Sequence, residues 1–137
     1  MNRTLFEQLI THALARLPDT FRAALDNVEI VVEREPHPAL LRRMGLRPDE
    51  TLLGLYEGIP LPERGHGYTF APPDIITLFQ GPIEREAHGD PDAIAQLVED
   101  VLLHELAHYF GFDEEQIRQI EAERDRQRQQ HNQGGSA

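Results

Sequence analysis

Two histidines and a glutamate near the C-terminal end of the chain have the spacing of a metal site. His104 and His108 are four residues apart, and Glu105 directly follows the first. On a helix, residues four apart lie one above the other, so both imidazoles can face one metal ion. Glu105 projects about 100° round the helix from His104, close enough to hold a water on that metal. The pattern therefore predicts a metal site with Glu105 as the base of a hydrolytic reaction.

The sequence before the motif strengthens this prediction, because a five-residue pattern alone recurs by chance. Residues 93–110 contain enough apolar side chains for a largely buried helix. An apolar stripe, at steps of three and four from Leu97, leads directly to His104 and His108. Unsatisfied imidazoles beside that stripe would be costly, and a metal with its water removes the cost. The alternative is that both histidines are ordinary core or groove residues and that Glu105 is solvated.

The residues after the motif offer a third ligand, which a catalytic zinc ion generally requires. Gly111 stands where a helix C-cap glycine belongs, and a turn there could return Asp113 or Glu114 towards the metal. Glu114 follows His108 by six residues, the spacing of the third ligand in one branch of zinc peptidases. Asp113 instead begins a capping box that ends at Gln116. We therefore expect Glu114 to be the ligand and Asp113 to be the cap of the next helix.

Three ordered segments resemble the small zincin-like metallopeptidases of bacteria, often called minimal zincins. The segments are LGLYEGIPLPER (53–64), PDIITLFQGPI (73–83) and HELAHYFGFDEE (104–115). The resemblance extends from about Leu17 to Glu121 and implies a compact α/β domain, one zinc ion per chain and peptidase activity on a peptide or protein substrate. Members of that family usually carry aspartate at the third-ligand position, where this chain has the longer Glu114.

Two other classes of zinc peptidase do not fit the sequence. Metzincins have a methionine turn downstream of the motif, whereas the only methionines here are Met1 and Met44. Peptidases of the thermolysin type have a distant glutamate-bearing helix, whereas this chain becomes a short polar tail after Glu121.

Length and composition indicate a single small domain. The chain has 137 residues, of which 39% are hydrophobic, and this is enough for one core. It has no cysteine, which excludes disulfides and thiolate metal sites. Its net charge of −11 argues against a nucleic-acid surface. We find no apolar run long enough to span a membrane and no signal peptide, and we therefore expect a cytoplasmic location. The sequence leaves the oligomeric state open.

The expected fold is α/β (α+β): a small twisted sheet of three or four strands, with an N-terminal helix and the metal-binding helix packed on it. We expect one domain over residues 1–122 and a polar, disordered tail over 123–137. The expected strands cover residues 28–33, 51–57 and 75–80. The expected helices cover residues 5–17, after a capping box at 4–7, then 19–25, 39–44 and a metal helix that begins at Asp90 and Pro91.

Three points remain open from the sequence. In zincins an edge strand pairs with the extended substrate, and residues 75–80 could be that strand or a central one. Tyr68 and His66 could stabilise the oxyanion of the reaction, or could belong to an ordinary flexible loop. The whole chain could be a zinc peptidase, a catalytically silent zinc-binding module, or an acidic interaction domain with merely buried histidines.

Overall fold

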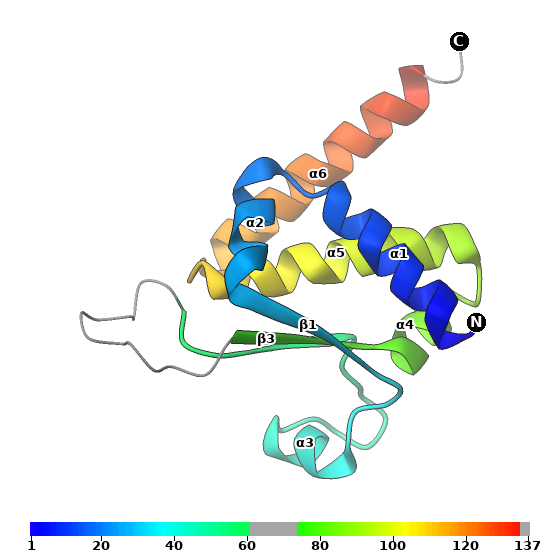
Figure 1. Cartoon of the computed structure of the whole chain (residues 1–137), viewed down its shortest axis with the longest axis vertical. Helices are drawn as coiled ribbons and strands as arrows, with labels where there is room; N and C mark the ends of the chain where they lie inside the picture. The colour runs from blue at the N-terminus through cyan, green and yellow to red at the C-terminus, as the bar shows by residue number, and fades with distance from the viewer. Residues whose placement is uncertain (61–73, 135–137) are drawn as a thin grey trace.

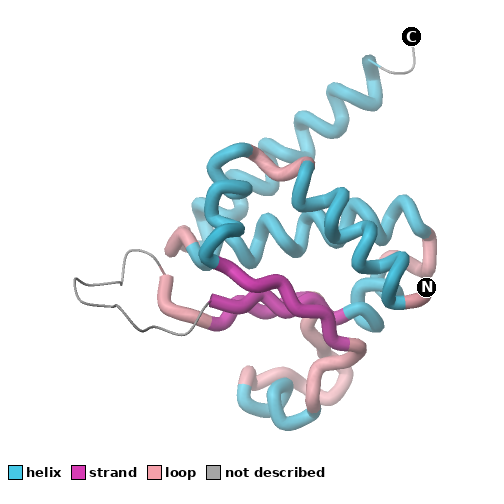
Figure 2. The backbone as a smooth tube through the Cα atoms, viewed as in Figure 1, coloured by secondary structure: helices cyan, strands magenta, loops and turns pink. Residues whose placement is uncertain are grey.

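The computed structural model describes residues 1–60 and 74–134, which form a three-stranded sheet covered on one face by helices (Figure 1). Figure 2 shows most helices gathered on the same side of the strands, with one short helix, α3, on the other side. The elements in chain order are α1 (Arg3–Ala15), α2 (Asp19–Ala23), the 3₁₀ turn η1 (Ala24–Asn27), β1 (Val28–Glu33), α3 (Pro38–Arg43), β2 (Gly54–Glu57), β3 (Asp74–Phe79), α4 (Gln80–Glu86), α5 (Pro91–Tyr109) and α6 (Glu114–Gly134).

The sheet is mixed, with the order β1-β3-β2. Strand β3 is central: it pairs in parallel with β1, where Ile30 lies opposite Ile76, and antiparallel with β2, where Tyr56 lies opposite Ile76. Of the two positions left open for residues 75–80, the central one is therefore correct. The central position agrees with the burial of the strand, since five of its six residues are buried. Strand β2 is an edge strand of the described sheet.

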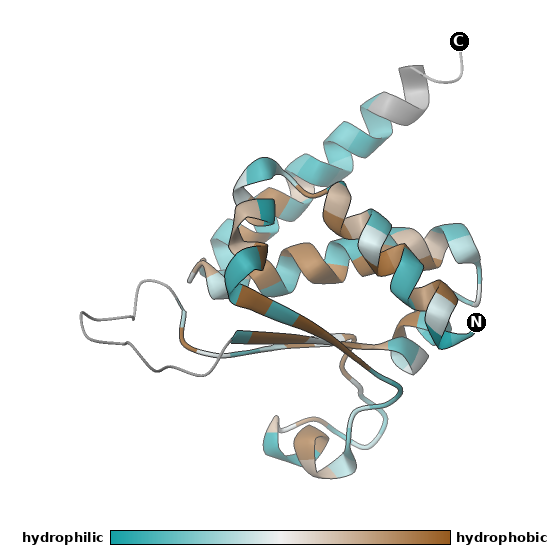
Figure 3. Cartoon of the chain, viewed as in Figure 1, coloured by the Kyte–Doolittle hydropathy of each residue, from teal (hydrophilic) through white to brown (hydrophobic). Residues whose placement is uncertain are grey.

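Helix α5 packs across the sheet and against α1, and these elements enclose the core. Hydrophobic colour runs along β1 and β3 and along parts of α1 and α5 (Figure 3). Burial of each large aliphatic side chain contributes about 1.5–3 kcal/mol to stability. Side chains with no more than 1% exposure include Phe6, Ile76, Leu78, Val98, Leu102 and Leu106. The observed α/β arrangement, with a three-stranded sheet and two long helices packed on it, confirms the expected fold class.

The helix starts show one correct and one wrong prediction. Asp90 is the N-cap of α5, as expected, because its Oδ2 accepts a hydrogen bond from the Ala93 amide at 3.0 Å. The capping box expected at residues 4–7 is wrong. Asn2 caps α1 instead, and its Oδ1 accepts from the Leu5 amide at 2.8 Å. Glu7 does not cap the helix, because its carboxylate forms an ion pair with Arg3 one turn earlier.

Helix α6 continues to Gly134, so residues 123–134 are helical where we expected disorder. Most of this helix is strongly polar, as the sequence indicated (Figure 3). Two of its arginines return to α5: Arg124 pairs with the buried Glu99, and Arg128 pairs with Asp100 at 2.8 Å. These ion pairs, rather than apolar burial, hold this part of α6 against α5. Among the described helices, none combines the length and the apolar character that crossing a membrane requires.

Candidate metal centre

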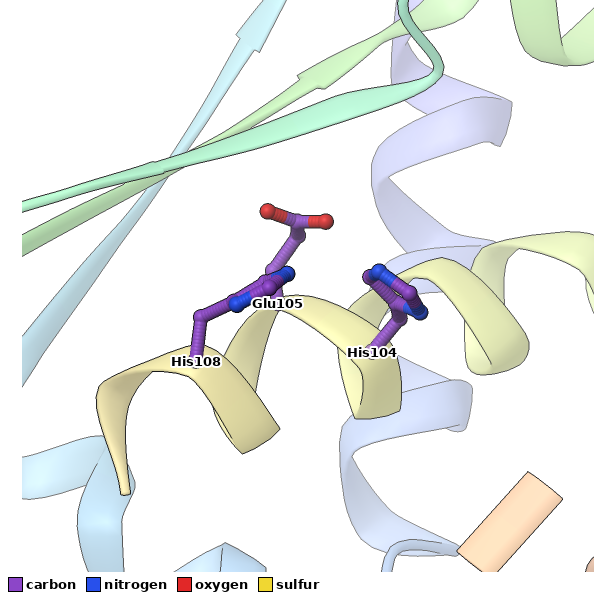
Figure 4. Close-up of side chains that lie close together, drawn as sticks. All are labelled: His104, Glu105 and His108. Carbon is purple, nitrogen blue, oxygen red and sulfur yellow. The ribbon is translucent and has the colours of Figure 1, made fainter. Parts of the chain in front are cut away.

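The last turns of α5 bring His104, Glu105 and His108 together. One potential ligand atom from each of these residues lies within 4.8 Å of the other two. The two imidazole rings meet edge to face, with centroids 5.0 Å apart. Figure 4 shows the three side chains on the same side of α5, with Glu105 pointing towards the strands. Each of the three residues is half-buried, so the group is open to a solvent ion and to a substrate.

The end of α5 is formed by local backbone geometry. Gly111 has φ +77°, and its amide donates to the His108 carbonyl at 2.9 Å. The next amide, of Phe112, reaches back to the Ala107 carbonyl at 3.1 Å. This is the glycine cap that the sequence predicted, and it ends the helix directly after the second histidine. Phe112 and its neighbour Phe110 then pack against Phe21, which anchors the turn below the site.

A backbone amide of strand β2 binds the Glu105 carboxylate. The Tyr56 amide donates a hydrogen bond to Glu105 Oε1 at 2.9 Å. Tyr56 is itself fixed, because its hydroxyl donates to Asp74 Oδ2 at 3.1 Å and its ring lies edge to face with Tyr109. Oε1 of the Glu105 carboxylate therefore accepts a hydrogen bond from the strand, and Oε2 can accept a proton during a reaction.

A glycine makes this contact possible. A Cβ atom added to Gly54 would lie 2.6 Å from Val101 Cγ1 and 3.4 Å from Glu105 Cγ. Only a residue without a side chain allows β2 to approach α5 so closely. Neither Gly54 nor Tyr56 was predicted from the sequence to be part of the site. The one available signal was a glycine within a strand pattern, which marks close approach of another backbone or helix.

The environment of Glu105 shifts the pKa of its carboxyl group upward. Burial raises the pKa of the Glu105 carboxyl above its ordinary value. The neighbouring His104 and His108, and the hydrogen bond from the Tyr56 amide, lower this pKa in part, while the charge of Glu114 raises it further. A raised carboxylate pKa is the property that a general base working near neutral pH requires.

The two candidates for the third ligand have different positions. Asp113 is the cap of α6: its Oδ1 accepts from the Gln116 amide at 2.8 Å, and the Gln116 side chain accepts from the Asp113 amide at 2.9 Å. The predicted capping box is thus confirmed. Glu114 is the exposed first residue of α6, near enough for its charge to act on Glu105. Its carboxylate is not part of the group of three within 4.8 Å, so its role as a ligand stays a prediction.

A second residue of α6 reaches the site and was missed by the sequence analysis. Glu121 Oε1 lies 2.7 Å from His104 Nδ1. Both residues line a pocket of about 370 Å³ between β2, α5 and α6, together with Gly54 and Glu105. No spacing rule could have found this pair, because its members lie on different helices. The helix that contains Glu121 was expected to begin after Asp113, but no contact between Glu121 and His104 was predicted.

Tyr68 and His66, the candidates for oxyanion stabilisation, lie outside the described residues. The donor set itself fits zinc, which prefers imidazole nitrogen and carboxylate oxygen when no thiolate is present.

Comparison with known families agrees with this geometry. A family model described as zincin-like metallopeptidase matches residues 25–124, which is more than half of the chain. The matched region contains the whole sheet, all of α5 and the first half of α6, including Glu114 and Glu121. No curated protein matches the chain.

Proposed function

This chain belongs to the family of zincin-like metallopeptidases, and from that membership we propose that it is a zinc-dependent peptidase that hydrolyses peptide bonds. The observation that carries the proposal is the group formed by His104, Glu105 and His108 beneath an edge strand. A half-buried group of two imidazoles and a carboxylate is not needed to stabilise the end of a helix. It is, however, the arrangement that metal-assisted hydrolysis requires.

We assign His104, His108 and Glu114 as the zinc ligands. The two histidines have the required helical spacing, and Glu114 is the first residue of α6, directly after the turn that begins at Gly111. The charge of Glu114 contributes to the raised pKa of Glu105, and this supports the assignment. When bound, zinc lowers the pKa of a water molecule towards 7 and polarises the scissile carbonyl.

Glu105 has the role of general base in this proposal. Its Oε1 is held by the Tyr56 amide at 2.9 Å, so its second oxygen can receive a proton from the attacking water. Its raised pKa favours proton uptake, and Glu105 then passes the proton to the leaving amine. The hydrogen bond from β2 fixes the carboxylate in place during both transfers.

The substrate in this proposal is an extended peptide or a segment of a protein. Strand β2 is an edge strand of the described sheet, and its outer side faces α5 next to Glu105. A peptide that adds to this edge as a further strand would bring its backbone carbonyls past the catalytic group. Main-chain pairing of this kind supplies affinity without selecting a particular side chain.

Metal content and cleavage of a peptide mixture together test the proposal. The wild-type protein should carry close to one zinc per chain and cleave peptides in a chelator-sensitive way. Glu105→Gln should keep the zinc and lose cleavage, whereas His108→Ala should lose both. The matched control is Glu115→Gln, which removes the same charge from an exposed residue that pairs with Arg118, and it should retain both properties. Absence of zinc in the wild type would refute the proposal, and zinc without cleavage would indicate a silent metal-binding module.

A further inference from the structure

We infer that Glu121 is a positioning residue for His104, holding the imidazole in the tautomer and orientation in which its Nε2 can bind the metal. The inference deepens the proposed function and rests on its assignment of His104 as a ligand. Glu121 lies in the helix after the metal-binding helix and is not part of the motif.

The hydrogen bond itself assigns the tautomer. Glu121 Oε1 lies 2.7 Å from His104 Nδ1, a short distance typical of a charge-assisted bond. An ionised carboxylate can only accept hydrogen bonds, so the proton must be on Nδ1. The lone pair of a neutral imidazole is then on Nε2. Histidines that bind metals commonly donate their other ring N–H to a carboxylate, and this fixes the ring and increases its basicity.

The same distance distinguishes a positioning role from a ligand role. Two ligand atoms on one tetrahedral zinc ion, each about 2.0–2.1 Å from the metal, lie about 3.3 Å apart. The atoms of Glu121 and His104 are closer than this and are hydrogen-bonded directly. Glu121 also lies outside the group of three residues whose ligand atoms are within 4.8 Å of one another.

Other contacts of α6 hold Glu121 in place. Ile117, one turn before Glu121, is buried in the core. Arg124, almost one turn after Glu121, pairs with the buried Glu99 of α5. The helix is therefore attached to α5 on both sides of Glu121, and this compensates for the partial exposure of the Glu121 side chain, which is 46% accessible. This attachment also gives the helical C-terminal segment a function in the metal site.

Nitrogen NMR on the metal-free protein tests the tautomer directly. With ¹⁵N-labelled histidine at about pH 8.5, well above the ordinary histidine pKa of about 6.5, long-range couplings show which ring nitrogen of His104 carries the proton. We expect Nδ1–H in the wild type and a shift towards Nε2–H in Glu121→Ala. Glu121→Gln should keep Nδ1–H, because its amide oxygen still accepts a hydrogen bond.

Zinc affinity, measured by competition with a chromophoric chelator, is the second readout. Glu121→Ala should bind zinc about 10- to 100-fold more weakly than the wild type, and Glu121→Gln should lose less. The matched control is Glu123→Gln, an exposed residue of the same helix that pairs with Arg126, and it should bind zinc like the wild type. The absorption spectrum of the cobalt-substituted protein should show the same ligand set in all variants.

Three results would overturn the inference. They are an unchanged His104 tautomer in Glu121→Ala, equal zinc affinity in Glu121→Ala and the wild type, and a cobalt spectrum that reveals a lost ligand in Glu121→Gln. A wild-type protein that binds no zinc would instead contradict the proposed function. The tautomer comparison in the metal-free protein would still decide whether Glu121 orients His104.

Discussion

Replacement of Gly54 by alanine tests whether the close approach of β2 to α5 forms the catalytic site. The new methyl group would lie 2.6 Å from Val101 Cγ1, whereas carbon atoms pack best at about 3.5–4.0 Å. The strand or the helix must therefore move by about 1 Å. A displacement of this size along the Tyr56–Glu105 hydrogen bond would extend it from 2.9 Å to beyond the normal range of about 2.7–3.2 Å.

The expected loss of stability for Gly54→Ala follows from these distances. Overpacking costs about 1–3 kcal/mol, and loss of the conformational freedom of glycine in the unfolded chain offsets this by about 0.4–1 kcal/mol. We expect a net destabilisation of about 1–2 kcal/mol, which at a slope of about 1.5 kcal/mol per M lowers the urea midpoint by about 1 M. The midpoint is measured by circular dichroism at 222 nm. Peptidase activity should fall further, since misplacement of a catalytic group by 1 Å can cost about 100-fold.

A second substitution makes this prediction specific. Val101→Ala removes the Cγ1 atom that the new methyl group would meet. The double variant should then be at least about 1 kcal/mol more stable than the sum of the single effects predicts, which is the coupling expected for residues in contact. Unchanged stability of Gly54→Ala, or strictly additive effects in the double variant, would refute the reasoning. Either result would mean that β2 can move away from α5 without cost.

Three further predictions concern Glu105, the start of α6 and the contact between α5 and α6. Folding raises the pKa of Glu105 above its ordinary value of 4.5, so stability linked to this group is present below that pH and is lost as pH rises through the folded-state pKa. Metal-free Glu105→Gln, which mimics the protonated form, should melt at a higher temperature than the wild type at pH 7, and the difference should vanish near pH 4. Glu114→Ala should weaken zinc binding by more than about 100-fold, whereas Asp113→Ala should cost about 1 kcal/mol of stability by loss of the cap and change zinc affinity far less. Equal zinc affinities in those two variants would remove Glu114 as the ligand. Glu99→Gln removes the buried charge that pairs with Arg124, so it should lower the free energy of unfolding by about 2 kcal/mol. It should also reduce the helical signal at 222 nm in circular dichroism. An unchanged signal would show that α6 is stable without this ion pair.

The sequence was sufficient for features that depend on residues close together in the chain. The spacing of His104, Glu105 and His108 placed them on one side of a helix, and the structure brings them together. The N-cap Asp90 and the C-cap Gly111 were also predicted correctly. Each of these features rests on helical periodicity or on a hydrogen bond between residues a few positions apart. Such interactions are largely independent of the rest of the fold, so the local pattern is enough to predict them.

Only the tertiary structure decided how these residues are supported. Strand β3 could have been central or at the edge, and the answer depends on the pairing of three strands that are distant in the chain. The Tyr56 amide and the Glu105 carboxylate are 49 residues apart, and the Glu121–His104 hydrogen bond joins two helices. The length of α6 also depends on a distant contact. Its polar sequence indicated a tail, whereas the ion pair between Arg124 and Glu99 attaches this part of the helix to α5. Contacts of this kind depend on which strands pair and how the helices pack across the whole core, and the spacing of residues close together in the chain does not determine either.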